Sequence, residues 1–472
     1  MNFDQALSYL LSLGHETLTI KLGLKNTETL LEALGNPHQQ FPAVQIAGTN
    51  GKGSVAVTLD SICRAAGIRT GLFTSPHLVS ITERIAIDGK PISEPDFGRL
   101  TSQVKTTAEA LVKQGELETL PTFFEHVTAI ALLAFREAKV ELAILETGLG
   151  GRLDSTTAVG ADIVAITPIA MDHQEYLGHS LKEIAAEKAA IIRPGVAAVI
   201  APQDKEALQV ILSRCKAVGV HPRFVESAEY SSLSTNGPGR IHDPPRVALA
   251  ATPVRSRFCS ASADGHCVVT FATDHSEYEY VRLGLRGRHQ IANVATAVAL
   301  AEALCERGFQ ITHEAIIHGV ELARHPGRLE LWEGQGRILF DGAHNPAAAR
   351  ALRDYLDEFV KKPITMIFGA MRDKALNEMA AILFPKADAL ILTSLDNPRA
   401  ANLEMLTEAA PETFDKSRIY QVSSVVEALR LARQMTPAKG LVCVTGSLYL
   451  VGAIQENLSR EDRIVAHQRV EH

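Results

Sequence analysis

Apolar runs rich in β-branched residues recur along much of the chain, and stretches with helical spacing lie between them. The strand candidates include residues 41–48, 140–148, 161–169, 195–202, 336–343, 363–370, 388–394 and 440–447. These runs are nearly continuous rather than alternating, which suits strands that are covered on both faces. The pattern therefore predicts an α/β fold with mostly parallel sheets.

Two changes along the chain indicate its domain organisation. Residues 225–266 are rich in Ser, Pro and Gly and predict loops around short antiparallel strands. Helical patterns follow as far as residue 330, and the α/β pattern then starts again. The segment ARHPGR, residues 323–328, is the best boundary. We therefore expect two domains of unequal size, residues 1–324 and 325–472.

The segment GTNGKGS, residues 48–54, lies between an apolar run and a helical pattern, which is the layout of a phosphate-binding loop. Its glycines let successive backbone N–H groups point at one anion, and the helix that starts near Ser54 adds its dipole. Lys52 supplies a charge for the terminal phosphates. Gly53 stands where the common motif has the Mg²⁺-binding hydroxyl, which has moved one position to Ser54. The layout favours phosphate binding over a packing turn.

Two side chains that end or follow strands are candidate metal ligands. Glu146 lies at the carboxyl end of an apolar run, where open α/β sheets place ligands, and its carboxylate suits Mg²⁺. A solvated acid is the alternative. His173 follows the next strand candidate and the acid Asp172, although a lone loop histidine is more often a surface group. The residues alone leave both alternatives open.

Lys188 lies in a helix that is predicted to begin with the capping box SLKE at Ser180. Helical spacing places Ile184, Ile191 and Ile192 on the same side as Lys188. An amine on an apolar face is costly unless it is neutralised or modified. The alternative is a lysine whose stem covers the helix edge while its amine reaches water.

Composition excludes several classes of function. Of the 472 residues, 46% are hydrophobic and 21% are charged, as in ordinary soluble globular proteins. The net charge of −7 argues against a general nucleic-acid or membrane-surface role. The first residues include Asp4 and no basic region, so we expect no signal peptide, and no apolar run is long enough to span a membrane. The six cysteines are scattered without CxxC pairs, which predicts reduced thiols in a cytoplasmic protein.

Several segments together resemble the folate branch of the Mur ligase superfamily, the folylpolyglutamate and dihydrofolate synthases. One is GTNGKGS with its shifted hydroxyl. The others occur in the order of that family and span nearly the whole chain: TSPHLVSITERI (74–85), TFFEHVTAIA (122–131), ETGLGGRLDST (146–156), ITPIAMDHQEYLGHSLKEIAAEKAAIIRPG (166–195), HPGRLE (325–330), DGAHNP (341–346) and GSLYLVG (446–452). The resemblance implies an N-terminal phosphate-loop ATPase domain of the Mur ligase central type, with a mostly parallel sheet. It also implies a smaller C-terminal, Rossmann-like glutamate-ligase domain.

The resemblance implies an ATP-dependent ligase that adds L-glutamate to dihydropteroate, to the γ-carboxylate of reduced folates, or to both. ATP would phosphorylate a substrate carboxylate, and the amine would attack the acyl phosphate to give an amide, ADP and phosphate. The alternatives are folylpolyglutamate synthase activity alone, a phosphate-loop switch ATPase, and a peptidoglycan-type Mur ligase. GTNGKGS and SPHL oppose the last of these. The family also implies a monomer that binds these small molecules and no nucleic acid or membrane.

The resemblance also implies roles for particular residues. The nucleotide-binding residues are Gly48, Thr49, Asn50, Gly51, Lys52, Gly53, Ser54, Asn293, Arg328 and Asp341. The ligands of two Mg²⁺ ions are Ser54, Ser75, Glu146 and His173. The residues that serve catalysis are Lys52, His173 and a carbamylated Lys188. The substrate-side residues are Gly23, Leu24, Thr122, Phe123, Phe124, Glu125, Leu153, Asp154, Ser155 and His344.

Simpler explanations exist for some of these positions. Phe123 and Phe124 suit stacking on a flat heterocycle, but adjacent phenylalanines more often belong to a core. Asn293 is also explained by a helix-start hydrogen bond, Arg328 by a surface charge, and much of DGAHNP by helix initiation. Thr157 stands where the family commonly has Asn, which puts the local loop geometry or a pterin contact in doubt.

Overall fold

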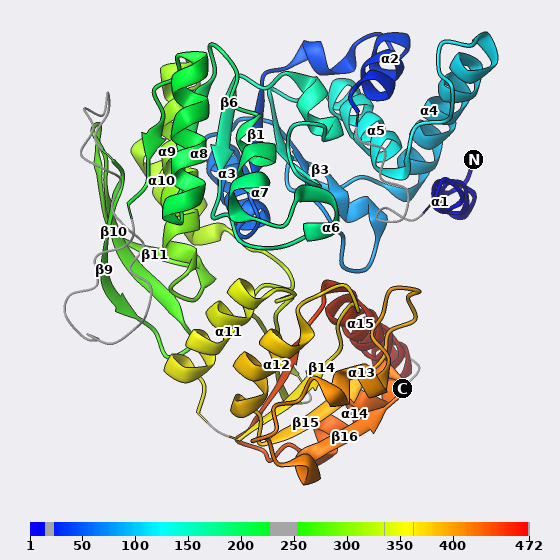
Figure 1. Cartoon of the computed structure of the whole chain (residues 1–472), viewed down its shortest axis with the longest axis vertical. Coiled ribbons are helices and arrows are strands. Elements are labelled where there is room, and N and C mark those ends of the chain that lie inside the picture. Colours follow the sequence, from blue (N-terminus) through cyan, green and yellow to red (C-terminus); the bar gives the residue numbers. More distant parts are fainter. Residues whose placement is uncertain (15–22, 227–252, 335, 362, 471–472) are drawn as a thin grey trace.

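The computed structural model describes residues 1–14, 23–226, 253–334, 336–361 and 363–470. It contains two α/β domains, each built on its own sheet (Figure 1). Each of the eight apolar runs contains a strand, and the predicted fold class is confirmed. Within the described ranges, no helix combines the length and the apolar character that crossing a membrane requires.

The larger N-terminal sheet has eight strands in the order β4-β3-β2-β5-β1-β6-β7-β8. Their bounds are β1 (Ala43–Ala47), β2 (Thr70–Phe73), β3 (Ile85–Ile87), β4 (Lys90–Pro91), β5 (Leu142–Glu146), β6 (Ile163–Ile166), β7 (Ala197–Ile200) and β8 (Arg223–Phe224). From β2 to β8 neighbouring strands are parallel, while β3 and β4 add antiparallel pairs at one edge. Every residue of β1 and β5 is buried, which explains why their sequences are continuously apolar.

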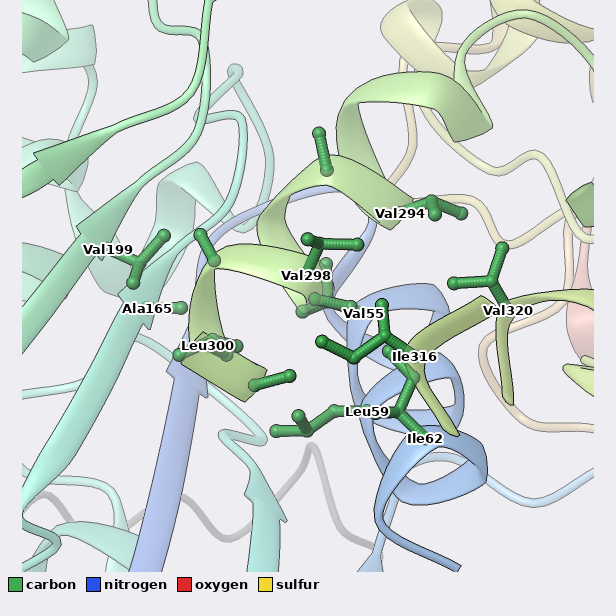
Figure 2. Packing of buried hydrophobic residues seen from close by; sticks show 14 of the residues in the cluster. Val55, Leu59, Ile62, Ala165, Val199, Val294, Val298, Leu300, Ile316 and Val320 are labelled. Carbon is green, nitrogen blue, oxygen red and sulfur yellow. The ribbon is translucent and has the colours of Figure 1, made fainter. Parts of the chain in front are cut away.

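Helices cover both faces of this sheet. One face carries α3 (Lys52–Ala65), α9 (Gln290–Glu306) and α10 (His313–Leu322), which share a core with β1 and β5. Figure 2 shows apolar side chains of this contact: Val55, Leu59 and Ile62 from α3, Val294 and Val298 from α9, and Ile316 and Val320 from α10. The other face carries α1 (Phe3–Ser12), α2 (Lys25–Ala33), α4 (Glu94–Gln114), α5 (Phe123–Ala138), α7 (Leu181–Ala189) and α8 (Lys205–Val218).

A three-stranded antiparallel sheet packs on the outer side of α9 and α10 (Figure 1). Its strands are β9 (Arg255–Ala261), β10 (His266–Ala272) and β11 (Glu277–Arg286). Helix α9 therefore lies between two sheets, and it is apolar on all sides for that reason. The expected antiparallel strands near residues 225–266 are found in the described part, whereas the loop prediction for residues 227–252 lies outside the described residues.

The C-terminal sheet has six strands in the order β12-β13-β17-β14-β15-β16. Their bounds are β12 (Glu330–Gly334), β13 (Gly336–Phe340), β14 (Ile364–Phe368), β15 (Ala389–Thr393), β16 (Ile419–Val422) and β17 (Leu441–Thr445). Only the β12–β13 hairpin is antiparallel among its described pairs. The sheet packs between α11 (Pro346–Phe359), α12 (Leu376–Leu383) and α13 (Leu403–Glu408) on one face and α14 (Val425–Met435) and α15 (Leu448–Val470) on the other.

Candidate functional site

A cavity of about 580 Å³ lies between the two domains, and both contribute to its lining. On the N-terminal side, Gly48, Ser75 and Glu146 lie at or just beyond the carboxyl ends of β1, β2 and β5. On the C-terminal side, Asp341 and Ser447 follow β13 and β17. Open α/β sheets bind ligands at this edge. The ligand-binding edges of both sheets therefore meet in one interdomain cavity.

Most of the residues predicted from the sequence line this interdomain cavity. They are Gly23, Gly48, Thr49, Asn50, Gly51, Lys52, Gly53, Ser54, Ser75, Thr122, Phe124, Glu125, Glu146, Leu153, Asp154, Ser155, His173, Lys188, Asn293, Arg328, Asp341 and His344. The first two residues of the substrate-side segment KLGL, at positions 21 and 22, lie outside the described residues. Segments spread over more than 300 positions thus meet at one place.

Phe123 and Leu24 are not among the residues that line the cavity, so their assignment to the substrate side stays a prediction. Phe123 is buried in the core around α5, with the Arg84 guanidinium 5.5 Å from its ring centroid. Leu24 only precedes the first turn of α2. Successive helical residues point about 100° apart, so the pair of phenylalanines divides between core and cavity. Phe124 does line the cavity, close against Gly148.

The phosphate loop is held open by backbone contacts. The N–H groups of Thr49 and Asn50 both donate to the Pro168 carbonyl, at 3.1 Å. Gly51 has a φ of 89° and precedes α3 without any side-chain cap. The N–H groups in the first turn of α3 thus remain available to an anion, as at phosphate-binding helix ends. Lys52 Nζ folds back to the Thr49 carbonyl at 3.3 Å.

Glu146 is a buried carboxylate that faces the cavity. It is 5% exposed, and its Oε2 accepts the Ser75 N–H at 3.1 Å. Burial raises its pKa, while the charges of Lys52 and Arg328 oppose that rise. A cation bound beside it would offset the cost of burying its charge. Glu146 therefore fits a metal ligand better than the solvated acid that was the alternative.

The donor set around Glu146 suits a metal that keeps other ligands of its own. Burial lowers the pKa of His173 to about 3, so its imidazole is neutral and able to bind a metal. Among the described residues, no group of three His, Cys, Asp or Glu side chains forms a metal cage by itself. Mg²⁺ usually takes one or two protein carboxylates and completes its shell with phosphate oxygens and water. The hydroxyl and carboxylate donors present fit that pattern.

Lys188 is buried rather than extended to the surface. Its side chain lies in α7, after the capping box that Ser180 forms with Glu183, and it is 5% exposed. Nζ donates to the Gly48 carbonyl at 2.8 Å. Burial, together with the nearby charge of Lys52, lowers the pKa of Lys188 to about 7. The amine is therefore partly neutral near pH 7, and the explanation as a surface-reaching lysine is wrong.

The two domains are joined at Asp172, which lies after β6. Its Oδ1 accepts Lys374 Nζ at 2.6 Å, and its Oδ2 accepts Asn345 Nδ2 at 3.1 Å. His344 Nε2 lies 3.7 Å from the same carboxylate. Burial opposes ionisation, but the surrounding His173, Lys374 and His344 hold the pKa of Asp172 well below its usual range. Asp172 is therefore an ionised contact point between the domains.

Residues from α9 and from the domain junction lie on another side of the cavity. Asn293 lies over Gly51, where a Cβ would come within 2.3 Å of Asn293 Oδ1, and its Nδ2 donates to Gln290 Oε1 in the first turn of α9. Arg328 is partly buried, which lowers its pKa, and one of its NH groups donates to the Gly342 carbonyl at 3.0 Å. It is not the surface charge that was the alternative. Asp341 accepts the N–H groups of Leu329 and Ala343, so its carboxylate also shapes this turn.

Thr157 stabilises the loop on the substrate side. Its Oγ1 donates to the Gly151 carbonyl at 2.6 Å and accepts Gln45 Nε2 at 2.7 Å. Asp154 accepts the N–H groups of Leu149 and Thr156 at the mouth of the same loop. The Thr157 hydroxyl thus links the glycine-rich segment to β1. Although the family commonly has Asn at this position, side-chain hydrogen bonds still stabilise the loop.

The cavity residues that were not predicted as site residues include Asp172, His325 and Lys374. Lys374 comes from a loop without a recognisable motif, His325 begins the segment HPGRLE but was not singled out, and Asp172 was considered only as a neighbour of His173. His325 Nδ1 lies 3.2 Å from Ser54 Oγ. Burial, with the charge of Arg328, lowers the pKa of His325 to about 3. The position of Lys374 shortly after β14 is a signal that could have marked it.

Comparison with known protein families gives two matches that cover most of the chain. The Mur ligase middle domain matches residues 46–301. The Mur ligase glutamate ligase domain matches residues 327–448.

Individual relatives agree with these matches. A dihydrofolate synthase/folylpolyglutamate synthase of Bacillus subtilis is 35% identical over 451 residues, covering 94% of this chain and 97% of the relative. The structure of Mycobacterium tuberculosis folylpolyglutamate synthase with ADP has a TM-score of 0.83 at 30% identity, over 96% of this chain and 97% of that one. A bifunctional synthase of Yersinia pestis with AMPPNP and a Mn ion has a TM-score of 0.79 at 29% identity, over 97% and 98%.

Proposed function

The chain belongs to the Mur ligase family, and we propose that it is an ATP-dependent ligase that adds L-glutamate both to dihydropteroate and to the γ-carboxylate of reduced folates. The observation that carries the proposal is the interdomain cavity. In it, a phosphate loop and a buried carboxylate from one domain face cationic side chains from the other. That combination suits the transfer of a phosphoryl group to a carboxylate.

The proposed reaction proceeds through an acyl phosphate. The substrate carboxylate attacks the γ-phosphorus of ATP and ADP leaves, after which the glutamate amine displaces phosphate and forms the amide. Lys52 and the N–H groups at the start of α3 would stabilise the charge on the transferred phosphoryl group. Because the cavity lies between two domains, it would keep water away from the labile acyl phosphate.

We propose that Ser54 binds one Mg²⁺ ion together with ATP, and that Ser75, Glu146 and His173 bind a second. The Mn ion in the Yersinia pestis structure supports the use of a divalent metal. Such ions would offset the negative charge of the phosphates during transfer. Glu146 supports the second site because a nearby cation would offset the cost of burying its charged carboxylate.

We also propose that the two domains divide at residues 323–328, close to where α10 ends and β12 begins. We propose that the enzyme is a monomer, as the resemblance to the family implies. We place this activity in the cytoplasm, where ATP and reduced folates would be available and where scattered thiols stay reduced.

The products formed from two acceptors test the proposed function. We expect purified enzyme with ATP, Mg²⁺, glutamate and bicarbonate to add the mass of one glutamate to dihydropteroate and to a reduced folate in separate reactions. Mass spectrometry measures both products. A mass increase on the folate alone would leave only folylpolyglutamate synthase activity. ADP release without an amide on either acceptor would contradict the ligase assignment and favour a switch ATPase.

We propose that CO₂ modifies Lys188. The neutral Nζ attacks the carbon of CO₂, an N–C bond forms, and the amine proton passes to solvent, which leaves a carbamate. Burial has already lowered the pKa of this amine to about 7, so a large fraction of it is neutral near pH 7 without help from a base. The resulting carboxylate would support the second metal.

The modification should depend on pH with a definite sign. Below its pKa the amine is protonated and cannot attack CO₂, so we expect the carbamate to increase from about pH 6 to about pH 8. The signal of ¹³C-labelled bicarbonate bound to the protein, followed by NMR, measures this directly, and Lys188→Arg should lack the signal. Full activity in CO₂-free buffer together with no carbamate signal would rule the modification out.

A further inference from the structure

His325 and Ser54 connect the domain junction to the phosphate loop. Ser54 lies in the first turn of α3, and His325 lies in the HPGR turn, where the chain passes towards the second domain. Ser54 Oγ and His325 Nδ1 are 3.2 Å apart although 271 positions separate them in the sequence. Both residues line the interdomain cavity.

Gly53 provides the room for this contact. A Cβ at position 53 would lie 2.8 Å from His325 Cε1 and 3.0 Å from Nε2, closer than real Cβ contacts. It would lie 3.4 Å from Glu146 Oε2, which is an ordinary contact. The imidazole therefore occupies the space where the common phosphate loop carries its serine or threonine side chain. The glycine at position 53, which stands in place of a hydroxyl side chain, is therefore what allows the imidazole of His325 to lie there.

A hydroxyl that binds a metal needs a hydrogen-bond acceptor for its proton. When the oxygen of Ser54 faces a cation, its O–H must point elsewhere, and Nδ1 of His325 lies within reach. An acceptor there would fix the rotamer of Ser54 and aim its lone pairs into the cavity. Hydrogen-bond partners that do not themselves bind the metal commonly orient its ligands in this way.

We infer that His325 is a positioning residue that holds the Ser54 hydroxyl for the metal–nucleotide complex, in the space that Gly53 leaves free. This inference rests on the proposed function, since it needs a nucleotide and a divalent metal in the cavity. Because His325 belongs to the domain junction, the arrangement also makes tight metal–nucleotide binding depend on the position of that junction.

The binding of ADP, measured by calorimetry with and without Mg²⁺, tests this inference apart from amide formation. His325→Ala should leave the affinity for metal-free ADP near the wild-type value and reduce the gain from Mg²⁺ by about ten- to a hundredfold. His325→Asn places an amide oxygen near the position of Nδ1 and should restore most of that gain. His325→Gln reaches towards the position of Nε2 instead and should not.

Two results would overturn the inference: an unchanged gain from Mg²⁺ in His325→Ala, or equal rescue by Gln and Asn. If amide formation fails while these ADP results hold, the ligase assignment falls and the role of His325 stands.

A double substitution tests the shared space separately. Gly53→Ala should lower the thermal unfolding midpoint when His325 is present, because the added Cβ collides with the imidazole. In a His325→Ala background the same change should be neutral or stabilising, since alanine favours a helix and the collision is gone. Additive effects of the two substitutions would show that the two positions do not compete for space, and would contradict the inference.

Discussion

Replacing Lys52 with methionine is expected to lower kcat about a thousandfold, because the lysine charge acts on the phosphoryl group while it is transferred. The side chain stands in the first turn of α3, beside Glu146 and Lys188, whose pKa values its charge lowers. In the structure its amine rests on the Thr49 carbonyl, a weak contact that it can exchange for a phosphate oxygen. Release of ADP with saturating folate and glutamate measures the effect.

Lys182→Met is a matched control, since Lys182 is an exposed lysine near the start of α7. The control should keep wild-type kcat, and both variants should keep the wild-type unfolding midpoint. If Lys52→Met retained more than about a tenth of the wild-type kcat, Lys52 would not stabilise the transferred phosphoryl group, and the role of the phosphate loop in chemistry would have to be revised.

The central strands of both sheets could be predicted because strands that are buried on both faces have continuously apolar sequences. Strands β1 and β5 are covered on both faces, and their residues are apolar without interruption. Short edge strands such as β4 and β8, with two residues each, carry too little apolar sequence to be recognised. The three-stranded sheet was only partly foreseen, since its strands lie in a stretch dominated by loop residues.

The local parts of the site could be predicted for a similar reason. A loop, a lysine and a helix start are consecutive in sequence, so the phosphate loop is visible as one segment. The contacts between Asp172 and Lys374, and between Ser54 and His325, join positions 202 and 271 residues apart. They depend on how the two domains face each other, which no local pattern records. The separation of Phe123 from Phe124 depended in turn on the orientation of α5.

Lys374 supplies the second domain's principal charge at Asp172. It lies between β14 and α12, its side chain is 9% exposed, and it lines the interdomain cavity. Nearby Arg399 also lines the cavity and pairs with Asp373 at 2.7 Å. Glutamate carries two carboxylates that need cationic partners when water is excluded. Lys374 is placed to exchange Asp172 for one of them.

We therefore expect Lys374→Met to raise the KM for glutamate about a hundredfold, a loss of about 2.7 kcal/mol that matches one charge-assisted hydrogen bond. The affinity for ADP should stay unchanged, because Lys374 Nζ donates to Asp172 rather than to a residue of the phosphate loop. Glutamate titrations of ADP release and of amide formation measure both steps. Lys386→Met removes a lysine that pairs with Asp357 on the same domain, and it should leave the KM for glutamate as in the wild type.

Asp172→Asn distinguishes substrate binding from domain closure. If Lys374 binds glutamate, this variant should lower kcat with every substrate, by weakening the contact between domains, while the KM for glutamate changes little. If the Lys374–Asp172 ion pair acts only by holding the domains together, both variants should lower kcat equally and leave that KM nearly unchanged. Equal effects would therefore exclude Lys374 from the glutamate site and assign its charge to domain closure.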